Sequence, residues 1–186
     1  MIQIYTGDGK GKTTAALGLA MRSAGHGFKV RIIQFMKGGT YSGELLSLAK
    51  LGVEIYQFGR TCPHAAVIKN GFMECQKCNE CWIGKKEITD LDRRKISLAW
   101  QLARETLKQD YQLLILDEIC NAIKYNLVSL QEVLAFTRDL PEGMELVLTG
   151  RNAPVELMEK AHLVSEIKKI KHPFDAGIGS RRGIEY

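Results

Sequence analysis

Short apolar runs alternate with amphipathic stretches along most of this chain. The apolar runs are rich in Ile, Leu and Val and nearly continuous, which is typical of strands buried on both faces of a parallel sheet. The stretches between them repeat apolar residues every three or four positions, which indicates helices. The sequence predicts strands at Ile2–Thr6, Lys29–Phe35, Val53–Phe58, Gln112–Asp117, Glu145–Thr149 and Leu163–Ile170. It predicts helices at Thr14–Ala24, Glu44–Lys50, Asp90–Lys108, a region after Asp117 through Ile123, Leu130–Asp139 and Pro154–Ala161.

This order of strands and helices predicts an α/β fold, with a mostly parallel sheet and helices on both faces. The alternation stops once, over residues 59–86, where cysteines, Pro63 and Gly71 gather. A segment of that length without regular structure is usually functional or disordered. The sequence has no internal repeat and no linker. We therefore expect one domain over residues 1–186, with a cysteine-bearing insertion at about 59–86.

A glycine-rich loop follows the first predicted strand. Residues 6–14 read Thr-Gly-Asp-Gly-Lys-Gly-Lys-Thr-Thr and lead into an alanine-rich helix. Glycines let backbone N–H groups surround an anion, and the helix N-terminus and a lysine add positive charge. The pattern predicts a P-loop-type phosphate site, with Lys12 on phosphate and the Thr13 hydroxyl facing Mg²⁺. Thr6 stands where the usual pattern has its first glycine, and a turn that merely caps the helix is the alternative. A dinucleotide loop fits less well, because no acid follows the strand Val30–Phe35.

Two acidic residues, Asp117 and Glu118, follow the buried run Leu113–Leu116. The carboxyl ends of parallel strands share one edge, so these acids should lie beside the phosphate loop, where Mg²⁺ sits. Asp117 is expected to reach Thr13 and the metal directly or through water, and Glu118 to bind metal or orient a water. The alternative is that both acids cap a helix. Arg151 follows the next predicted strand and suits either a phosphate or carboxylate contact or a solvated surface position.

Cys75, Cys78 and Cys81 are spaced C-x₂-C-x₂-C, and Cys62 lies upstream in the same segment. A tripod with a remote fourth thiolate is more typical of iron–sulfur ligation than of a zinc ribbon. The alternatives are a zinc tetrathiolate, in which His64 can replace Cys62, and unliganded surface thiols. Metal ligation would also supply folding energy to a segment with few apolar residues.

Composition and net charge limit the classes of partner that this chain is expected to bind. The chain has 186 residues, 45% hydrophobic and 25% charged, which is typical of a globular protein with one well-filled core. Its net charge of +5 suits an anionic substrate, and no arginine-rich block or aromatic platform indicates nucleic acid. No apolar run approaches the roughly 18 residues of a membrane span. Because the chain opens with strand residues rather than a signal peptide, we expect a cytoplasmic protein. Its five cysteines are then no disulfide framework, and the isolated Cys120 is a packed small side chain.

Several motifs resemble those of the P-loop-type ATP:corrinoid adenosyltransferases. Together they cover nearly the whole chain except the cysteine segment, and those nearest the C-terminus are the most specific. The matching stretches are residues 6–14, Ile33–Gly38, Leu116–Glu118, Leu148–Pro154, Val164–Ile167, Lys171–Ile178 and Arg182–Tyr186.

The resemblance implies transfer of the 5′-deoxyadenosyl group of ATP to the Co(I) of a corrinoid, either cobalamin or a precursor. Triphosphate leaves, and the reaction serves adenosylcobalamin biosynthesis or salvage. The resemblance further implies a P-loop NTPase-like (RecA-like) fold, Mg²⁺, a reductase or reduced flavin as electron donor, and a homodimer. The catalytic residues would be Lys12, Thr13 and Glu118, and the Mg²⁺ ligands Thr13, Asp117 and Glu118. The nucleotide-binding residues would be Thr6, Gly7, Asp8, Gly9, Lys10, Gly11, Lys12, Thr13, Thr14 and Arg151.

In that family, aromatic side chains after the third strand pack against the lower face of the corrin and displace an axial ligand of Co(II), which eases reduction. Trp82 is the first candidate for this role and Phe72 the second; alternatively, either ring covers the cysteine site. An iron–sulfur cluster on the cysteines would lie beside the corrin and pass an electron to cobalt. Asp8 replaces an asparagine common in the family, and it is expected to point away from the phosphates or to help bind metal.

Two other functions are compatible with the sequence. A P-loop nucleoside kinase also pairs a phosphate loop with cysteine ligands, but there the cysteines follow the magnesium-binding strand, whereas here they precede it. A non-catalytic module that binds and delivers ATP and corrinoid is the second alternative, and turnover with reduced corrinoid distinguishes it from an enzyme.

Overall fold

The computed structural model describes residues 1–39, 41–76, 78, 80–84 and 87–186. The cysteine segment predicted at 59–86 therefore contains positions 77, 79, 85 and 86, which lie outside the described residues. The four cysteines of that segment and Trp82 are all within them.

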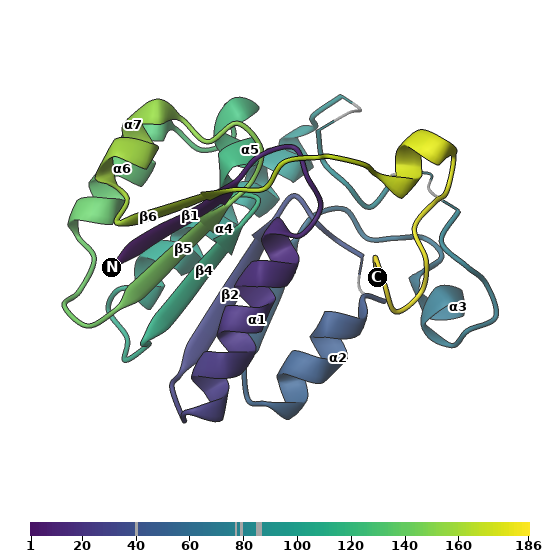
Figure 1. Ribbon diagram of the computed structural model, residues 1–186, viewed down its shortest axis with the longest axis horizontal. Coiled ribbons are helices and arrows are strands. Elements are labelled where there is room, and N and C mark those ends of the chain that lie inside the picture. The colour runs from purple at the N-terminus through teal and green to yellow at the C-terminus, as the bar shows by residue number, and fades with distance from the viewer. Residues whose placement is uncertain (40, 77, 79, 85–86) are drawn as a thin grey trace.

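In the described residues, six strands form one parallel sheet in the order β3-β2-β4-β5-β1-β6 (Figure 1). Strand β4 lies between β2 and β5, and all of its residues are buried. This arrangement confirms the predicted α/β class with a mostly parallel sheet. The strands are β1 (Ile2–Thr6), β2 (Val30–Phe35), β3 (Glu54–Phe58), β4 (Leu113–Asp117), β5 (Glu145–Thr149) and β6 (Leu163–Glu166).

Helices cover both faces of the sheet (Figure 1). Successive strand residues point to opposite faces, so Ile32 and Ile33 belong to two different apolar clusters. One face packs against α1 (Lys12–Gly25) and α2 (Gly43–Lys50). The other face is covered by α4 (Asp90–Thr106), α5 (Ile119–Lys124), α6 (Leu130–Arg138) and α7 (Val155–Lys160). Among the helices that the structure describes, none has the length and apolar content needed to cross a bilayer.

The last predicted strand, Leu163–Ile170, is wrong beyond Glu166. There the chain leaves the sheet and crosses the glycine-rich loop, where the Ile167 carbonyl accepts a hydrogen bond from the Gly9 N–H at 2.8 Å. Two short elements were not predicted: α3 (Ala65–Lys69) inside the cysteine segment and a 3₁₀ helix at Pro173–Ala176. Other boundaries differ by one or two residues, which is ordinary fraying.

Arg60 joins the two ends of the cysteine segment. It follows β3, and its Nε donates to both carboxylate oxygens of Asp92 at 3.0 and 3.2 Å, while its Nη2 donates to the Glu87 carbonyl at 2.7 Å. Asp92 also completes a capping box with Thr89 at the start of α4. The Arg60 guanidinium, with the Thr89 hydrogen bonds, holds the pKa of the buried Asp92 well below its usual range. The Arg60–Asp92 ion pair therefore holds the two ends of the segment together.

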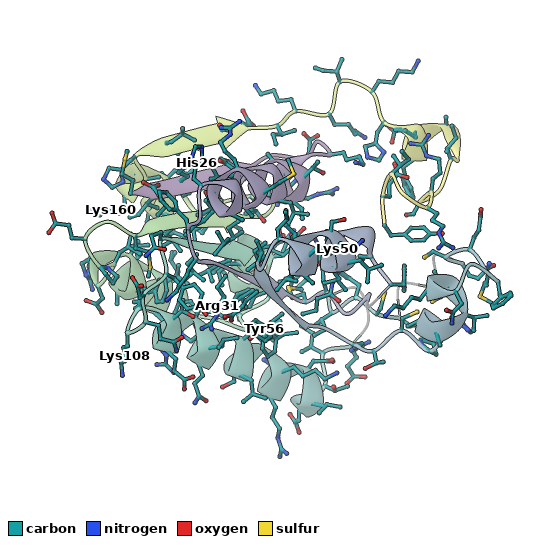
Figure 2. All side chains as sticks on the ribbon, turned by 90° about the horizontal axis from the view of Figure 1, so that it is seen from below. His26, Arg31, Lys50, Tyr56, Lys108 and Lys160 are labelled. Carbon is teal, nitrogen blue, oxygen red and sulfur yellow. The ribbon has the colours of Figure 1, made fainter. Side chains whose placement is uncertain are left out.

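A second polar network lies at the amino end of the sheet, away from the loops that follow the strands. The buried Arg31 pairs with Glu54 at 2.6 Å, and its guanidinium lies 4.1 Å from the ring centroid of Tyr111 and 5.8 Å from that of Tyr56 (Figure 2). A buried guanidinium needs such partners, because a charge without them is strongly disfavoured. This network therefore contributes to stability rather than to the site described below.

Replacing Asp92 with Asn should lower the free energy of unfolding by about 2–4 kcal/mol near pH 7, because Arg60 loses its buried partner. The folded pKa of Asp92 is depressed, so the pair contributes its full stability above the ordinary Asp pKa. This contribution shrinks as the pH falls below that value and is lost as the pH falls through the depressed folded pKa. Urea unfolding at about pH 7 and about pH 3 should show the gap between wild type and variant narrowing in acid. The exposed Asp90→Asn is the control, with a small effect at both pH values. An equal Asp92 gap in neutral and acid solution would contradict the assignment.

Candidate active site

The loop between β1 and α1 needs glycine for two physical reasons. Gly7 and Gly11 have φ angles of 101° and 125°, a region that side chains disfavour. A Cβ on Gly7 would lie 2.4 Å from the Ile167 carbonyl oxygen, and one on Gly9 would lie 2.8 Å from it. The loop therefore takes its shape partly from the chain segment that crosses it after β6.

A cavity of about 600 Å³ opens over this loop. The predicted nucleotide-binding residues on its wall are Gly9, Lys10, Gly11, Lys12, Thr13, Thr14 and Arg151. Glu118 also lines it, together with residues that were not predicted: Lys37, Glu44, His172 and the C-terminal Gly183–Tyr186. The phosphate loop, Glu118 and Arg151 thus face the same space.

Three predicted loop residues, Thr6, Gly7 and Asp8, are not on the wall of this cavity. Thr6 is buried, and its hydroxyl accepts a hydrogen bond from the Ala153 N–H at 3.2 Å. Asp8 accepts from the Lys169 N–H at 3.0 Å, and this hydrogen bond lowers the pKa of its carboxyl. The Asp8 carboxylate therefore points toward the crossing segment, and it lines a neighbouring cavity.

Lys12 is 7% exposed, and its Nζ donates to the Gly9 carbonyl at 2.6 Å, so the side chain folds over its own loop. Burial lowers the pKa of the Lys12 ammonium, against the opposing pull of the Glu118 carboxylate. A buried cation with one neutral partner is a strong site for an anion.

Asp117 ends β4 in register with Gln34 of β2 and is fully buried. Its Oδ1 accepts from the hydroxyls of Thr13 at 2.9 Å and Thr149 at 2.6 Å. Its Oδ2 accepts from the Lys37 ammonium at 2.7 Å and from the Gln34 amide at 3.0 Å. Burial alone would raise the pKa of Asp117, but the charge and hydrogen bonds of these neighbours lower it. Asp117 is therefore an ionised carboxylate at the base of the cavity.

Glu118 has φ 65° and ψ 19°, a left-handed conformation that non-glycine residues rarely adopt. The Thr149 hydroxyl accepts the Glu118 N–H at 3.0 Å, and the Asn121 amide donates to its carboxylate. Burial, together with the adjacent Asp117 charge, raises the pKa of Glu118. This strained turn directs Glu118 toward the cavity while Asp117 stays beneath it.

Hydroxyl and carboxylate oxygens are the ligands that Mg²⁺ prefers, and Thr13, Asp117 and Glu118 supply them. A cation already bridges two of these groups, because the Lys37 ammonium contacts both Thr13 Oγ1, at 3.1 Å, and Asp117. These residues therefore fit the ion. No cluster of three or more His, Cys, Asp or Glu suited to a metal occurs in the part of the chain that the structure describes.

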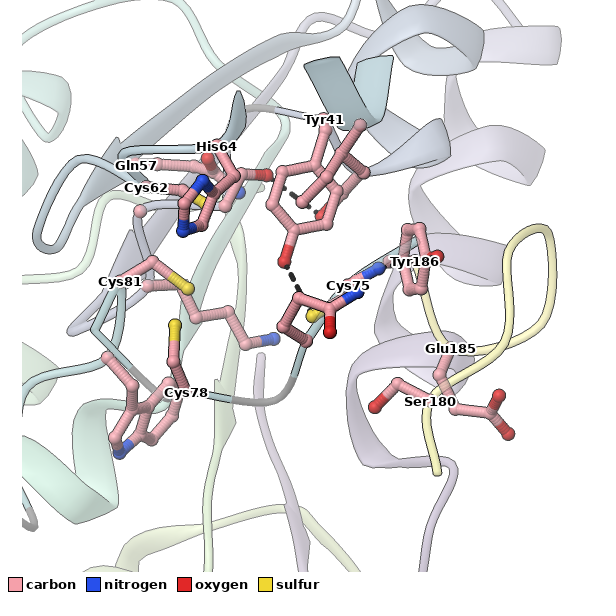
Figure 3. Close-up of a pocket in the computed structure, with 17 residues that line it drawn as sticks. Tyr41, Gln57, Cys62, His64, Cys75, Cys78, Cys81, Ser180, Glu185 and Tyr186 are labelled. Carbon is pink, nitrogen blue, oxygen red and sulfur yellow. Dashed lines mark hydrogen bonds between the residues drawn. The ribbon is translucent and has the colours of Figure 1, made fainter. Parts of the chain in front are cut away.

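The four clustered cysteines line one cavity of about 230 Å³, together with His64 (Figure 3). Figure 3 shows Cys78 and Cys81 pointing toward one another, with Cys75 across the cavity. The Tyr41 hydroxyl donates to Cys75 Sγ at 3.3 Å. Thiolate sulfur and imidazole nitrogen, the donors that a thiophilic metal prefers, therefore line one cavity. Within the described residues, however, no three of these side chains lie close enough together to bind one metal ion.

The aromatic candidates lie in different places. Trp82 pairs its backbone with Lys37 and lines both the cysteine cavity and a third cavity of about 660 Å³. Glu118 and Arg151 belong to this third cavity and also to the one over the phosphate loop. Phe72 is 85% exposed and lines none of the three.

Sequence reasoning missed Lys37 and His172 as site residues. Both lie in stretches that carry the family resemblance, and Lys37 lies two residues past the carboxyl end of the buried strand β2. That position is the signal that could have identified Lys37, since the same argument identified Asp117 and Arg151.

The family model and the sequence relatives agree with one another. The family model described as ATP:corrinoid adenosyltransferase BtuR/CobO/CobP matches residues 1–186. A corrinoid adenosyltransferase of Escherichia coli (strain K12) is 34% identical over 187 residues, which span 100% of this chain and 85% of that protein. One from a Sinorhizobium species is 33% identical over 189 residues, 100% of this chain and 80% of that protein. Among solved structures, the KaiC-like protein PH0186 from Pyrococcus horikoshii OT3 gives a TM-score of 0.45 at 15% identity, over 92% of this chain and 74% of that chain.

Gly9→Ala should weaken ATP binding by about tenfold or more, because its new Cβ meets the backbone of residues 167 and 168 at 2.8 Å and the loop must shift. Gly18→Ala is a matched control in the exposed middle of α1, where nothing lies within 4 Å of the added carbon. It should leave ATP binding unchanged and stabilise the helix slightly. Isothermal titration with ATP and Mg²⁺ measures both. Equal ATP affinity in Gly9→Ala and wild type would contradict the packing argument.

Proposed function

Because this chain belongs to the ATP:corrinoid adenosyltransferase family, we propose that its glycine-rich loop holds the triphosphate of ATP as the leaving group of adenosyl transfer. The protein is a transferase that adenosylates corrinoids at the expense of ATP. What is proposed here is which residues carry out this reaction. The observation that carries the proposal is that Glu118 and Arg151 line both the cavity over the loop and the cavity beside Trp82.

The reaction needs no protein base. The electron pair of Co(I) in the reduced corrinoid attacks C5′ of ATP, the C5′–O5′ bond breaks, and its electrons leave with triphosphate as the Co–C bond forms. Negative charge therefore builds on the departing oxygen. Lys12, Lys10 and the loop N–H groups would stabilise that charge, and Arg151, which lines the same cavity, would contact the phosphates.

Thr13, Asp117 and Glu118 would hold Mg²⁺, with Thr13 and Glu118 on the cavity wall and Asp117 beneath. When bound, the ion neutralises the triphosphate and makes it a better leaving group. Thr6, Gly7 and Asp8 would shape the loop rather than contact phosphate.

We propose that the corrinoid docks in the cavity beside Trp82, with this ring against the corrin face. Tyr125 and Phe174 add aromatic surface to the same wall, and Lys124 and Lys169 add positive charge suited to polar corrin side chains. Phe72 stays the second candidate, and its exposure is compatible with a ring that contacts corrin only in the complex. A reductase or reduced flavin would supply the electron that forms Co(I).

Cys62, Cys75, Cys78 and Cys81 would hold an iron–sulfur cluster or a zinc ion. Their common cavity and their sulfur donors support this assignment. Lys37 and Trp82 line the same cavity, which supports a metal close to the proposed substrate sites. A cluster would supply an electron-transfer centre close to the corrinoid, whereas zinc would only stabilise the segment.

Three broader expectations stay as proposals. Both apolar clusters pack on the same sheet, which supports a single domain over residues 1–186. The exposed Ile170, Phe174 and Ile184 along the C-terminal segment support a homodimer. None of the five cysteines forms a disulfide, which supports a reducing, cytoplasmic location.

The decisive experiment incubates the protein with ATP, Mg²⁺ and chemically reduced cobalamin, and follows the cobalt–carbon product and the phosphate products. Stoichiometric triphosphate is expected, and ADP would instead indicate a kinase. Lys12→Ala should lower kcat by about a hundredfold or more, since a charge and a donor at the leaving group are lost. Lys160→Ala, on the surface at the end of α7, is the control and should match wild type. Activity of Lys12→Ala within a few-fold of wild type would contradict the site.

Anaerobically purified protein should contain a metal whose binding depends on the clustered cysteines. Visible absorbance bleached by dithionite would identify an iron–sulfur cluster, and a colourless protein with one zinc would identify zinc. Cys78→Ser and Cys81→Ser should each lose most of the metal, because each removes one thiolate ligand. Cys120→Ala is a thiol control outside the cavity and should keep it. Metal-free wild type with undiminished stability and activity would overturn the assignment.

A further inference from the structure

Lys37 connects the two halves of the proposed site. Its ammonium lies 2.7 Å from Asp117 Oδ2 and 3.1 Å from Thr13 Oγ1, the two side chains at the base of the phosphate cavity. Its side chain is 23% exposed, whereas that of Asp117 is 1% exposed. Lys37 therefore lies between the cavity and the buried carboxylate.

Asp117 has no acceptor position left. A carboxylate offers about four lone-pair positions, and those of Asp117 are taken by Thr13, Thr149, Gln34 and Lys37. A metal ion can reach this carboxylate only if one donor leaves. Gln34 and Thr149 are strand residues in the buried sheet, whereas Lys37 has a flexible stem that opens onto the cavity.

The Lys37 backbone is held firmly while its side chain is not. Its main chain pairs with Trp82, and the Ile83 N–H donates to the Met36 carbonyl at 3.1 Å. A Cβ on the following Gly38 would lie 1.9 Å from the Arg60 carbonyl oxygen, so the backbone there is in tight contact on both sides. Only the side chain is therefore able to move, and its ammonium can do so within the cavities that Lys37 lines.

The charge of the bound nucleotide would decide when the Lys37 ammonium leaves Asp117. Without nucleotide, Lys37 and Asp117 neutralise one another, and a divalent cation entering there would meet an ammonium group. A triphosphate brings several negative charges that attract both cations at once. We propose that Lys37 occupies the divalent-cation position until ATP arrives, so that Mg²⁺ binds only together with the triphosphate. Lys37 is then a positioning residue that sets the order of binding. This inference rests on the proposed Mg²⁺ site at Thr13 and Asp117.

The test measures Mn²⁺ binding without nucleotide, from the electron paramagnetic resonance signal of free Mn²⁺. Wild type should bind weakly, and Lys37→Gln should bind tighter by about tenfold or more, because a repelling unit charge within a few ångströms is gone. Lys37→Arg keeps the charge and should stay weak. Lys50→Gln, at the exposed end of α2, is the matched control for loss of a surface charge and should also stay weak.

The double variant Lys37→Gln with Asp117→Asn removes both charges and should return to weak binding, which assigns the Mn²⁺ to Asp117. Wild type needs no variant to be informative: Mg²⁺ alone should leave its melting temperature unchanged, and Mg²⁺ with ATP should raise it. Tight Mn²⁺ binding by nucleotide-free wild type, or a Lys37→Gln affinity equal to that of Lys50→Gln, would overturn the inference. The adenosyl-transfer assay on wild type tests the proposed reaction separately. A negative Mn²⁺ result therefore contradicts only the role of Lys37, whereas a negative transfer assay contradicts the proposed reaction.

Discussion

A carboxylate with no access to water, Asp117, determines how the elements around the site meet. An ionised carboxylate is stable away from water only if it is paired and hydrogen-bonded. Its partners are Thr13 from α1, Thr149 from β5, Gln34 from β2 and Lys37 from the loop after β2. One buried charge therefore ties the helix that follows the phosphate loop to three strands. Losing any partner leaves part of the charge uncompensated, so the geometry of this edge is strongly constrained.

Close backbone approaches place the neighbouring cavities around this charge. Gly9 lies under the segment after β6, Gly38 lies against Arg60, and Gly150 lies against Cys120. Each contact excludes a side chain and fixes one loop at the carboxyl edge of the sheet. The phosphate cavity and the cavity beside Trp82 therefore share a wall, and two substrates bound there would meet.

Much of this arrangement was predictable. The glycine-rich loop, the acids at the end of β4 and Arg151 just past β5 were identified because each lies at the carboxyl end of a buried apolar run, and parallel strands end at one edge. Lys37 follows β2 in the same way and was overlooked, because one lysine among many surface lysines has no distinguishing local pattern. The turn of the chain at Ile167 was missed because no glycine or proline marks the end of the strand there. The hydrogen bonds of residues 167 and 169 with Gly9 and Asp8, which lie far away in the sequence, hold the chain over the loop instead.

The range over which each interaction acts explains which features could be predicted from the sequence and which could not. The period of apolar residues, the positive φ of glycines and the chemistry of thiols and carboxylates act within a few residues, so the sequence by itself determined the α/β class, the phosphate loop and the candidate ligands. Tertiary structure alone decided that the Lys37 ammonium lies on Asp117 and Thr13, that Thr6 and Asp8 turn away from the phosphate cavity, and that Trp82 rather than Phe72 lines the cavity next to it. Those outcomes depend on contacts between residues far apart in the chain, where burial and charge pairing are settled only when the sheet has formed.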